Sequence, residues 1–405
     1  MKLPCTPIKK CLACGHNELE LTLDLGTQPL ANNFRDSAET VGEERFPLAV
    51  NRCTSCNHLQ LTHAVDPALI YTHYLYVSGT SNTYVEYMDW YADFVCEQFD
   101  RHPTGVLDIG CNDGSQLDAF KQRGVKTFGV DPAENLHPKS SSRHDVVLGF
   151  WNESSAGKLG RDFDIITTQN AFAHIPDPLA YLQLAREYLT NDGKIFISTS
   201  QADMVPNGEF DTIYHEHISY YNAESMRQLA ERAGLYLIDL VKTPIHGTSY
   251  IFVLAKHPAN RARMQNILAT EKAIGLQTPA TYTKWADGVR KLIVSLQEQI
   301  DEYQAWNYHI IGYGAAAKGM TLLNASSIKL DAVVDDNPLK QGLWCPGTTI
   351  PVVSSEYIKN IPAKDRVVFV PLAWNFYTEI KNKIKNIRNN ENDFFLRYFP
   401  EIKSE

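Results

Sequence analysis

Apolar residues recur at every second position in two stretches near the N-terminus. Leucine occupies all odd positions from 19 to 25, and positions 46, 48 and 50 are Phe, Leu and Val. This period of two is typical of a strand with one buried face. Both stretches are therefore predicted to be strands of a small N-terminal lobe.

Short apolar runs alternate with amphipathic segments between about residues 104 and 200. Residues 106–109 predict a strand that leads into Gly110, and residues 115–123 predict a helix. The remaining predicted elements are strands at 127–130, 163–166 and 194–198, a helix at 179–189, and an antiparallel pair at 236–241 and 250–255. This alternation predicts an α/β fold with a Rossmann-like parallel sheet.

The last third of the chain combines a long helical stretch with a second α/β pattern. Apolar residues at 285, 289, 292, 296, 300 and 303 have helical spacing, and Gly275 and Pro279 interrupt the stretch 259–303. We expect a helical connector there. Strand patterns around 309–312, 333–334 and 367–371 then predict a second, C-terminal Rossmann-like domain.

Composition and charge narrow the class of protein. The 405 residues are 44% hydrophobic and 21% charged, so a large core can form, and the length favours two or three domains. The net charge of −9 disfavours a nucleic-acid partner. No apolar run reaches the roughly 20 residues of a membrane span, and the start of the chain lacks a secretory signal. We expect a cytoplasmic protein that does not bind membranes.

Four of the eight cysteines form two C-x-x-C pairs, which are Cys11 with Cys14 and Cys53 with Cys56. In a reducing compartment such pairs are typical of tetrahedral zinc ligands. Four thiolates leave no open coordination position, so we predict a structural zinc ion and not a catalytic one.

The turn after the strand at 106–109 reads D-x-G-C-N-D-G, from Asp108 to Gly114. Asp131 follows Gly110 by 21 residues and ends the next strand, where an acid can bind ribose hydroxyls. The turn lacks G-x-G-x-x-G, and its carboxylates would repel a phosphate, so the pattern favours the cationic ligand S-adenosylmethionine. The predicted cofactor-binding residues are Asp108, Gly110, Asn112, Asp113, Asp131 and Asn170.

Titratable and aromatic residues are concentrated in the segment 210–222, after the strand at 194–198. Tyr214, His215, Glu216 and His217 supply a phenol, an orienting carboxylate and a base within four positions. The H-E-H run is too short for the H-E-x-x-H metal helix, which excludes a metalloprotease. His174 lies in a loop before a helix, where it either touches substrate or only shapes the helix entry.

A second glycine-rich turn, G-Y-G-A-A-A-K, runs from Gly312 to Lys318, and Asp335 follows Gly312 by 23 residues. The spacing fits NAD or another nucleotide diphosphate, and the sequence leaves both open. Lys318 could pair with a diphosphate, and Trp374 with Asn375 could stack a base or ring. His246 and Gly247 either line a pocket mouth or form a plain hairpin tip.

Together, these motifs resemble the sugar C-methyltransferases that act on TDP-linked 4-keto-deoxysugars and methylate them at C3. The resemblance rests on the two C-x-x-C pairs with L-G-x-Q-P-L at 25–30 between them, the D-x-G-C-N-D-G turn, Tyr214-x-Glu-His, His246-Gly247 and the G-Y-G-A-A-A-K turn. It implies a zinc-binding domain (1–70), a class I S-adenosylmethionine-dependent methyltransferase domain (71–256) and a helical connector with a C-terminal Rossmann-like sugar-nucleotide domain (257–405).

The resemblance also implies residue roles. His217 is expected to be the base, with Tyr214 and Glu216 as its neighbours and His174 as a second imidazole. Tyr76 is expected near the sugar, although Tyr74 could fill that role, and His215 replaces an expected acid. The expected substrate-binding residues are His246, Gly247, Tyr313, Lys318, Trp374 and Asn375.

A ketone at C4 would acidify the hydrogen at C3, so that a neutral imidazole could form an enolate for methylation. An O-methyltransferase on a sugar or polyketide hydroxyl is the alternative enzyme. A non-catalytic zinc and nucleotide-binding module is the alternative outside enzymes, but it leaves the acidic turn unexplained. We expect the protein to be a monomer or a weak homo-oligomer.

Overall fold

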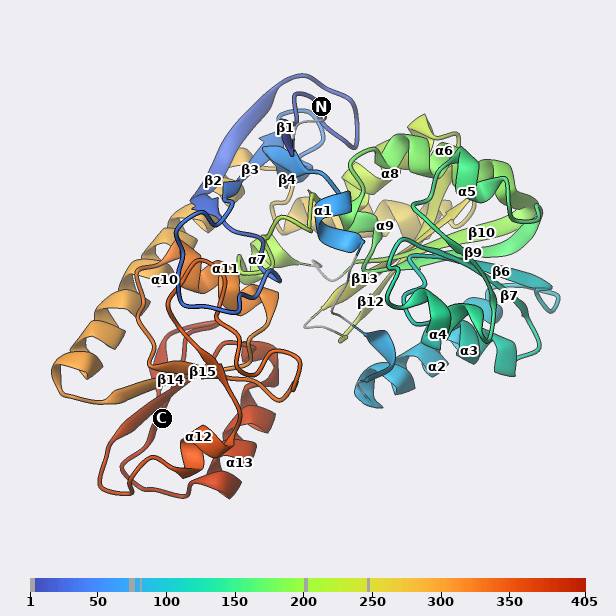
Figure 1. The fold of residues 1–405 in the computed structure, drawn as a ribbon. Coiled ribbons are helices and arrows are strands. Elements are labelled where there is room, and N and C mark those ends of the chain that lie inside the picture. The colour runs from blue at the N-terminus through green and yellow to red at the C-terminus, as the bar shows by residue number, and fades with distance from the viewer. Residues whose placement is uncertain (1–3, 73–76, 81, 200–202, 246–247) are drawn as a thin grey trace. The chain divides into compact units, whose positions relative to one another are not determined.

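The computed structural model describes residues 4–72, 77–80, 82–199, 203–245 and 248–405 (Figure 1). The chain divides into two compact units. The first unit comprises Met1–Glu20, Asn51–Asp203 and Glu216–Pro279, and the second comprises Leu21–Val50, Met204–His215 and Ala280–Glu405. The boundaries of these units differ from the predicted domain boundaries at residues 70 and 256. That domain division stays a prediction.

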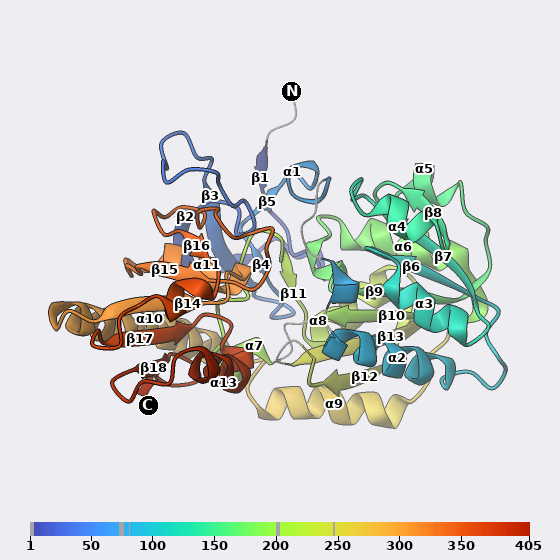
Figure 2. The same cartoon turned by 60° about the horizontal axis from the view of Figure 1, so that its bottom comes forward.

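A seven-stranded sheet of order β12-β13-β10-β9-β6-β7-β8 forms the centre of the first unit (Figure 2). Its strands are β6 (Gly105–Ile109), β7 (Lys126–Asp131), β8 (Asp145–Leu148), β9 (Phe163–Gln169), β10 (Leu189–Thr199), β12 (Tyr236–Thr243) and β13 (Ser249–Ala255). The first five strands pair in parallel, and β13 runs antiparallel to both of its neighbours. The predicted parallel sheet and antiparallel pair are thereby confirmed.

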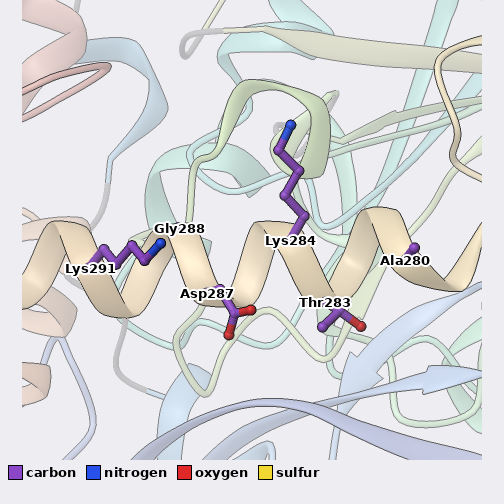
Figure 3. A pocket seen from close by; sticks show the side chains of 6 residues that line it. All are labelled: Ala280, Thr283, Lys284, Asp287, Gly288 and Lys291. Carbon is purple, nitrogen blue, oxygen red and sulfur yellow. The ribbon is translucent and has the colours of Figure 1, made fainter.

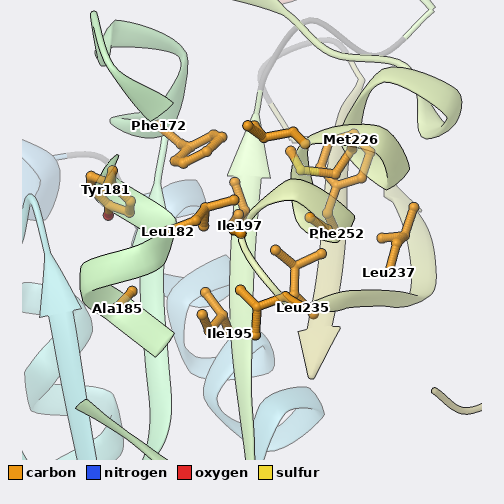
Figure 4. Close-up of a cluster of buried hydrophobic side chains, with 14 of the residues drawn as sticks. Phe172, Tyr181, Leu182, Ala185, Ile195, Ile197, Met226, Leu235, Leu237 and Phe252 are labelled. Atoms are coloured by element: carbon orange, nitrogen blue, oxygen red, sulfur yellow. The ribbon is translucent and has the colours of Figure 1, made fainter. Parts of the chain in front are cut away.

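Helices cover both faces of this sheet, and its central strands are therefore buried on both sides. On one face, α6 (Pro178–Tyr188) and α8 (Ala223–Arg232) pack against Ile195 and Ile197 of β10 (Figure 4). On the other face, α2 (Asn82–Cys96) and α3 (Ser115–Gln122) belong to the cluster that contains Phe196. The remaining helices of this unit are α1 (Ala68–Tyr71), α4 (His137–Ser141), α5 (Glu153–Ala156) and α9 (Arg261–Ala273).

The two predicted N-terminal strands are confirmed, but Leu21 of the first is exposed, so its buried face carries only Leu23 and Leu25 fully. β2 (Leu19–Gln28) and β3 (Phe46–Cys53) belong to a four-stranded sheet of order β11-β4-β3-β2, and β1 (Cys5–Pro7) pairs with β5 (His63–Val65). β4 (Leu59–Leu61) pairs antiparallel with β11 (Ser219–Tyr220), which lies inside the segment 210–222, where no strand was predicted. A two-residue strand has too short an alternation to be recognised from sequence.

A six-stranded sheet of order β16-β15-β14-β17-β18-β19 forms the centre of the second unit. Its strands are β14 (His309–Tyr313), β15 (Ala332–Val334), β16 (Val352–Val353), β17 (Val367–Pro371), β18 (Phe394–Arg397) and β19 (Lys403–Ser404), and its helices are α7 (Met204–Asn207), α10 (Pro279–Ala305), α11 (Ala317–Ala325), α12 (Glu356–Lys359) and α13 (Tyr377–Ile387). The predicted apolar stripe lies on α10, where it is buried except for the half-buried Leu292. Among the described helices, none combines the length and apolar character that crossing a bilayer requires.

Candidate active site

A glycine turn connects β6 to α3 at the carboxyl edge of the parallel sheet. Gly110 has φ 84°, and a β-carbon there would lie 2.7 Å from the β-carbon of Ala171. Its backbone N–H donates to the carbonyl of Val130 at 2.8 Å. Only glycine fits this conformation and this close approach, so the turn is fixed against the end of β7.

Asp131, at the end of β7, holds the same turn from the other side. Its Oδ2 accepts the N–H of Asn112 at 2.8 Å, and its Oδ1 accepts the N–H of Ala133 at 2.9 Å. Each carboxylate oxygen has a further lone pair, so Asp131 could also accept ribose hydroxyls.

Asp108 is the buried carboxyl that the turn leaves unsatisfied. Its Oδ1 has no hydrogen-bond partner among the described residues, and burial, with the charge of Asp131, raises its pKa to about 8. An unpaired buried carboxylate is costly, and a cationic ligand would remove that cost. This chemistry fits the ammonium and sulfonium groups of S-adenosylmethionine and opposes a phosphate.

Asp113 lies in the same turn but its side chain is already engaged. Its Oδ2 forms an ion pair with Lys139 Nζ of α4 at 2.6 Å, and its Oδ1 accepts the Ser115 hydroxyl at 2.7 Å. Arg143, two residues beyond the end of α4, donates to the Asp113 carbonyl at 2.7 Å. The geometry makes Asp113 a link between the turn and α4, and its predicted cofactor contact stays a prediction.

Unsatisfied polar atoms continue along the carboxyl ends of β9 and β10. Asn170 has φ 54°, and its N–H donates to the carbonyl of Ser198 at 2.9 Å. Asn170 Oδ1, Ser198 Oγ and Thr199 Oγ1 are buried without partners in the described part of the chain. In a doubly wound sheet this edge is where ligands bind. Sequence reasoning missed Ser198 and Thr199, although Ser198 ends the strand predicted at 194–198 and Thr199 follows it.

The rings of Tyr71, His174 and His217 form a stack next to these strand ends. The His174 ring centroid lies 5.3 Å from that of Tyr71, at 8°, and 5.2 Å from that of His217, at 27°. Burial lowers the pKa of His174 to about 3, and its Nε2 has no partner among the described residues. The structure therefore brings together the two predicted active-site imidazoles. Tyr71, which also donates to the Glu216 carbonyl at 3.3 Å, was missed because one tyrosine before a loop carries no signal of its own.

His215, which stands where the resemblance implies an acid, is held by the backbone. Its ring is buried, its Nε2 lies 3.2 Å from the carbonyl oxygen of Phe46, and burial lowers its pKa to about 4. A neutral imidazole that donates to a backbone carbonyl holds its loop in place. Tyr214 is half-buried. Tyr74, Tyr76, His246 and Gly247 lie outside the described residues, so their roles stay predictions.

The second unit repeats the glycine turn. Gly314, with φ 92°, donates its N–H to the carbonyl of Val334 at 2.7 Å, and Asp335 Oδ2 accepts the N–H of Ala315 at 2.7 Å. This turn leads into α11, on whose first turn Lys318 lies.

The aromatic residues near Lys318 are tightly held. Lys318 Nζ lies 4.8 Å from the ring centroid of Trp374 and has no hydrogen-bond partner in the described chain. Trp374 donates its Nε1–H to Asp211 at 2.7 Å. Tyr313 is buried and donates to Asp336 at 3.0 Å, which makes it part of the support for the turn. Asn375 is half-buried beside Trp374 in the chain.

A shallow hollow of about 500 Å³ lies on one face of α10 (Figure 3). It is lined by Ala280, Thr283, Lys284, Asp287, Gly288 and Lys291. These residues are successive positions of one helical face, and none of them is a predicted site residue.

The four predicted zinc ligands converge. The Cys11 and Cys56 sulfurs are 3.6 Å apart, those of Cys14 and Cys53 are 3.5 Å apart, and all four lie within 4.8 Å of one another. Four sulfurs at about 2.3 Å from a tetrahedral zinc ion would lie about 3.8 Å apart, so the cluster fits zinc.

Three family models match the chain in order. They describe a zinc binding domain (residues 11–71), a methyltransferase domain (82–240) and a C-methyltransferase C-terminal domain (244–400). The C-methyltransferase NovU of Streptomyces niveus is 30% identical over 407 residues, which cover 96% of this chain and 95% of NovU. The chain belongs to this C-methyltransferase family.

More distant similarities cover only part of the chain. The ubiquinone biosynthesis O-methyltransferase of Idiomarina loihiensis is 28% identical over 176 residues, 37% of this chain and 69% of that protein. The crystal structure of magnesium protoporphyrin IX methyltransferase from Synechocystis PCC 6803 with bound S-adenosylmethionine has a TM-score of 0.33 and 14% identity, with 43% of this chain and 79% of that chain covered.

The family membership identifies the protein as an S-adenosylmethionine-dependent C-methyltransferase with a class I methyltransferase core and a structural zinc ion. The bound cofactor supplies an electrophilic methyl group on a cationic sulfur. Asp108, Asp131 and Asn170, with the Gly110 turn, are the residues of this chain that fit it.

We predict that Cys14→Ser removes zinc and destabilises the protein, because three thiolates cannot close the tetrahedral site. Metal analysis should find much less than about one zinc ion per chain, and Tm should fall by about 5 °C or more. Cys5→Ser, which lies in the same lobe outside the cluster, is the control. Equal zinc content in both variants would exclude Cys14 as a ligand.

We predict that Asp108→Asn weakens binding of S-adenosylmethionine about 10- to 100-fold, because an amide cannot pair with the ligand cation. The unliganded Asp108 carboxyl has a pKa of about 8, so binding should release a proton. Affinity of the unmodified protein should therefore fall as the pH is lowered from about 7.5 to about 5.5.

Titration calorimetry measures the affinity for S-adenosylmethionine. Repeating it in two buffers of different ionisation enthalpy measures the proton release on binding. The exposed Asp145, at the start of β8, provides the matched control Asp145→Asn. An affinity that stays independent of pH in the unmodified protein would contradict this role of Asp108.

Proposed function

We propose that the methyl acceptor is C3 of a TDP-linked 4-keto-deoxysugar, and that His217 removes the C3 proton. The observation that carries this proposal is the stacking of the half-buried His174 ring on the buried His217 ring, which provides a base at the carboxyl edge of the sheet. The resemblance to sugar C-methyltransferases supplies the substrate class.

Methylation at carbon requires a carbon nucleophile. The C4 ketone makes the C3 hydrogen acidic, so an imidazole that takes this proton leaves an enolate whose negative charge lies mainly on oxygen. The C3–methyl bond then forms as the sulfur–methyl bond breaks, and the sulfonium becomes a neutral thioether. The proton remains on His217 until solvent removes it.

His174 influences this proton transfer through its charge. Because burial keeps His174 neutral, a proton that arrives on His217 meets no positive charge on the neighbouring ring. Two charged imidazoles 5.2 Å apart would repel each other by about 3 kcal/mol at an effective dielectric constant of about 20. The neutral partner therefore keeps His217 a usable base.

Holding both reactants in line supplies much of the rate. Correct orientation can contribute up to about 7–11 kcal/mol in favourable reactions. In this proposal the first unit holds the methyl donor and the base. Lys318 and Trp374 of the second unit bind the diphosphate and a ring of the sugar nucleotide, since an unpartnered ammonium beside an aromatic face suits both groups.

We predict that His217→Asn lowers turnover by at least about 100-fold while S-adenosylmethionine binding is retained, because general base catalysis is lost. Exchange of the C3 hydrogen in deuterated water, followed by NMR, should stop as well. His257→Asn, at an exposed position of the same unit, is the matched control.

The exchange measurement also separates carbon from oxygen methylation. An O-methyltransferase consumes no C3 hydrogen, so its substrate would retain that hydrogen and carry the new methyl on a hydroxyl. Full exchange in His217→Asn would instead identify another base.

We predict that Lys318→Met raises KM for the sugar nucleotide about 10- to 100-fold with little change in kcat, because a charged contact to the diphosphate is lost. Calorimetry with TDP should give a parallel loss of affinity. The exposed Lys364 provides the control Lys364→Met. An unchanged affinity for TDP, together with binding of NAD, would assign the second glycine turn to NAD instead.

A further inference from the structure

The zinc-binding turn and the segment that carries His217 meet in one short antiparallel pair. β4 begins three residues after the zinc ligand Cys56, and β11 begins two residues after His217. Ser219 lies opposite Gln60, and Tyr220 lies opposite Leu59. The strand next to the proposed base is therefore paired with the strand that leaves the zinc site.

Backbone hydrogen bonds fix the residue between His217 and β11 from two sides. The N–H of Leu61 donates to the carbonyl of Ile218 at 2.8 Å, and the N–H of Ile218 donates to the carbonyl of Ala173 at 2.8 Å. The second bond reaches the short helix that contains His174. Displacement of β4 would thus move both imidazoles of the stack.

His58 connects the zinc turn to β11 through both its backbone and its side chain. Its carbonyl accepts the N–H of the zinc ligand Cys53 at 2.9 Å, and its Nε2 lies 3.3 Å from Ser219 Oγ. Its ring packs on Tyr221, with 4.8 Å between the ring centroids. The His58 side chain is fully buried. Asn222 adds a weaker bond to the Asn57 carbonyl at 3.4 Å.

Neither zinc ligation nor packing alone explains why a histidine occupies position 58. The four thiolates already complete a tetrahedral site, and His58 Nε2 is directed at Ser219. An aliphatic side chain would fill the same space without the desolvation cost of a buried polar ring. The bond to Ser219 is what an aliphatic residue could not provide.

We infer that His58 is a positioning residue, which uses the bond to Ser219 Oγ to hold β11, and with it His217, in the geometry needed for proton removal. This inference rests on the proposed role of His217 as the base. It assigns the zinc-binding lobe a part in catalysis that leaves the methyl-donor site unaffected.

Three variants of the full-length zinc-loaded protein test the inference. His58→Phe keeps a ring against Tyr221 but loses the bond to Ser219. His58→Gln restores a hydrogen-bonding side-chain group close to the position of Nε2. Ser219→Ala removes the bond from the other side and leaves the zinc turn intact, so it remains informative if His58→Phe fails to fold.

The expected pattern is a loss of catalysis with normal binding. His58→Phe and Ser219→Ala should lower kcat and C3-hydrogen exchange about 10- to 100-fold, since small displacements of a reacting group have effects of this size. Zinc content and affinity for S-adenosylmethionine should change less than about twofold. His58→Gln should recover most of the activity. The double variant should lose no more than either single variant, because both remove one bond.

A measurement that needs no substrate separates this inference from the proposed function. In ring-labelled protein, the His217 imidazole signal, assigned by its loss in His217→Asn, should shift in His58→Phe and Ser219→Ala and return in His58→Gln. If the unmodified enzyme makes no C3-methylated product but these shifts occur, the substrate proposal fails and the positioning role stands. If the His217 signal and kcat are unchanged in both variants, or if zinc is lost in parallel with activity, the positioning role is refuted.

Discussion

Parallel pairing of β6 with β7 and β9 is the constraint on which the methyl-donor site depends. It brings the ends of three strands to one edge, so residues far apart in sequence, such as Asp108 and Asn170, lie on the same side of the sheet. Glycine at position 110 allows the turn to close against β7, and Asp131 holds that turn by accepting the backbone N–H of Asn112. The polar atoms at this edge that have no partner among the described residues are then available to a ligand.

Burial determines the chemistry of the titratable groups at this edge. Desolvation raises the pKa of Asp108 to about 8 and lowers that of His174 to about 3, so both side chains favour their neutral forms when no ligand is bound. A cationic cofactor would reverse this preference for Asp108. Asp108 is therefore suited to pair with a positive charge, and His174 to remain uncharged next to the proposed base His217.

Sequence patterns predicted the features that depend on local chain geometry. The two C-x-x-C pairs, the Gly110 turn and the strand that ends in Asp131 each depend on neighbouring positions, and all three were found as expected. Features that depend on distant partners could not be predicted. The ion pair of Asp113 with Lys139, which links the turn to α4, and the contact of His215 Nε2 with the Phe46 carbonyl each join residues that are far apart in the sequence. Pairing of β11 with β4 was missed for the same reason.

The two glycine turns share a framework but differ in charge. Gly110 and Gly314 both donate to the second-strand carbonyl, of Val130 and Val334 respectively, and Asp131 and Asp335 each accept a turn amide. Asp108 lies two residues before Gly110. The equivalent position of the second turn, two residues before Gly314, is Gly312. The second turn instead carries Lys318 on the helix that follows. An unpaired carboxyl suits a sulfonium, and an unpaired ammonium at a helix N-terminus suits a diphosphate. Because these side chains differ in charge, the same strand-turn-helix geometry can bind a cation in one unit and, in the function proposed here, an anion in the other.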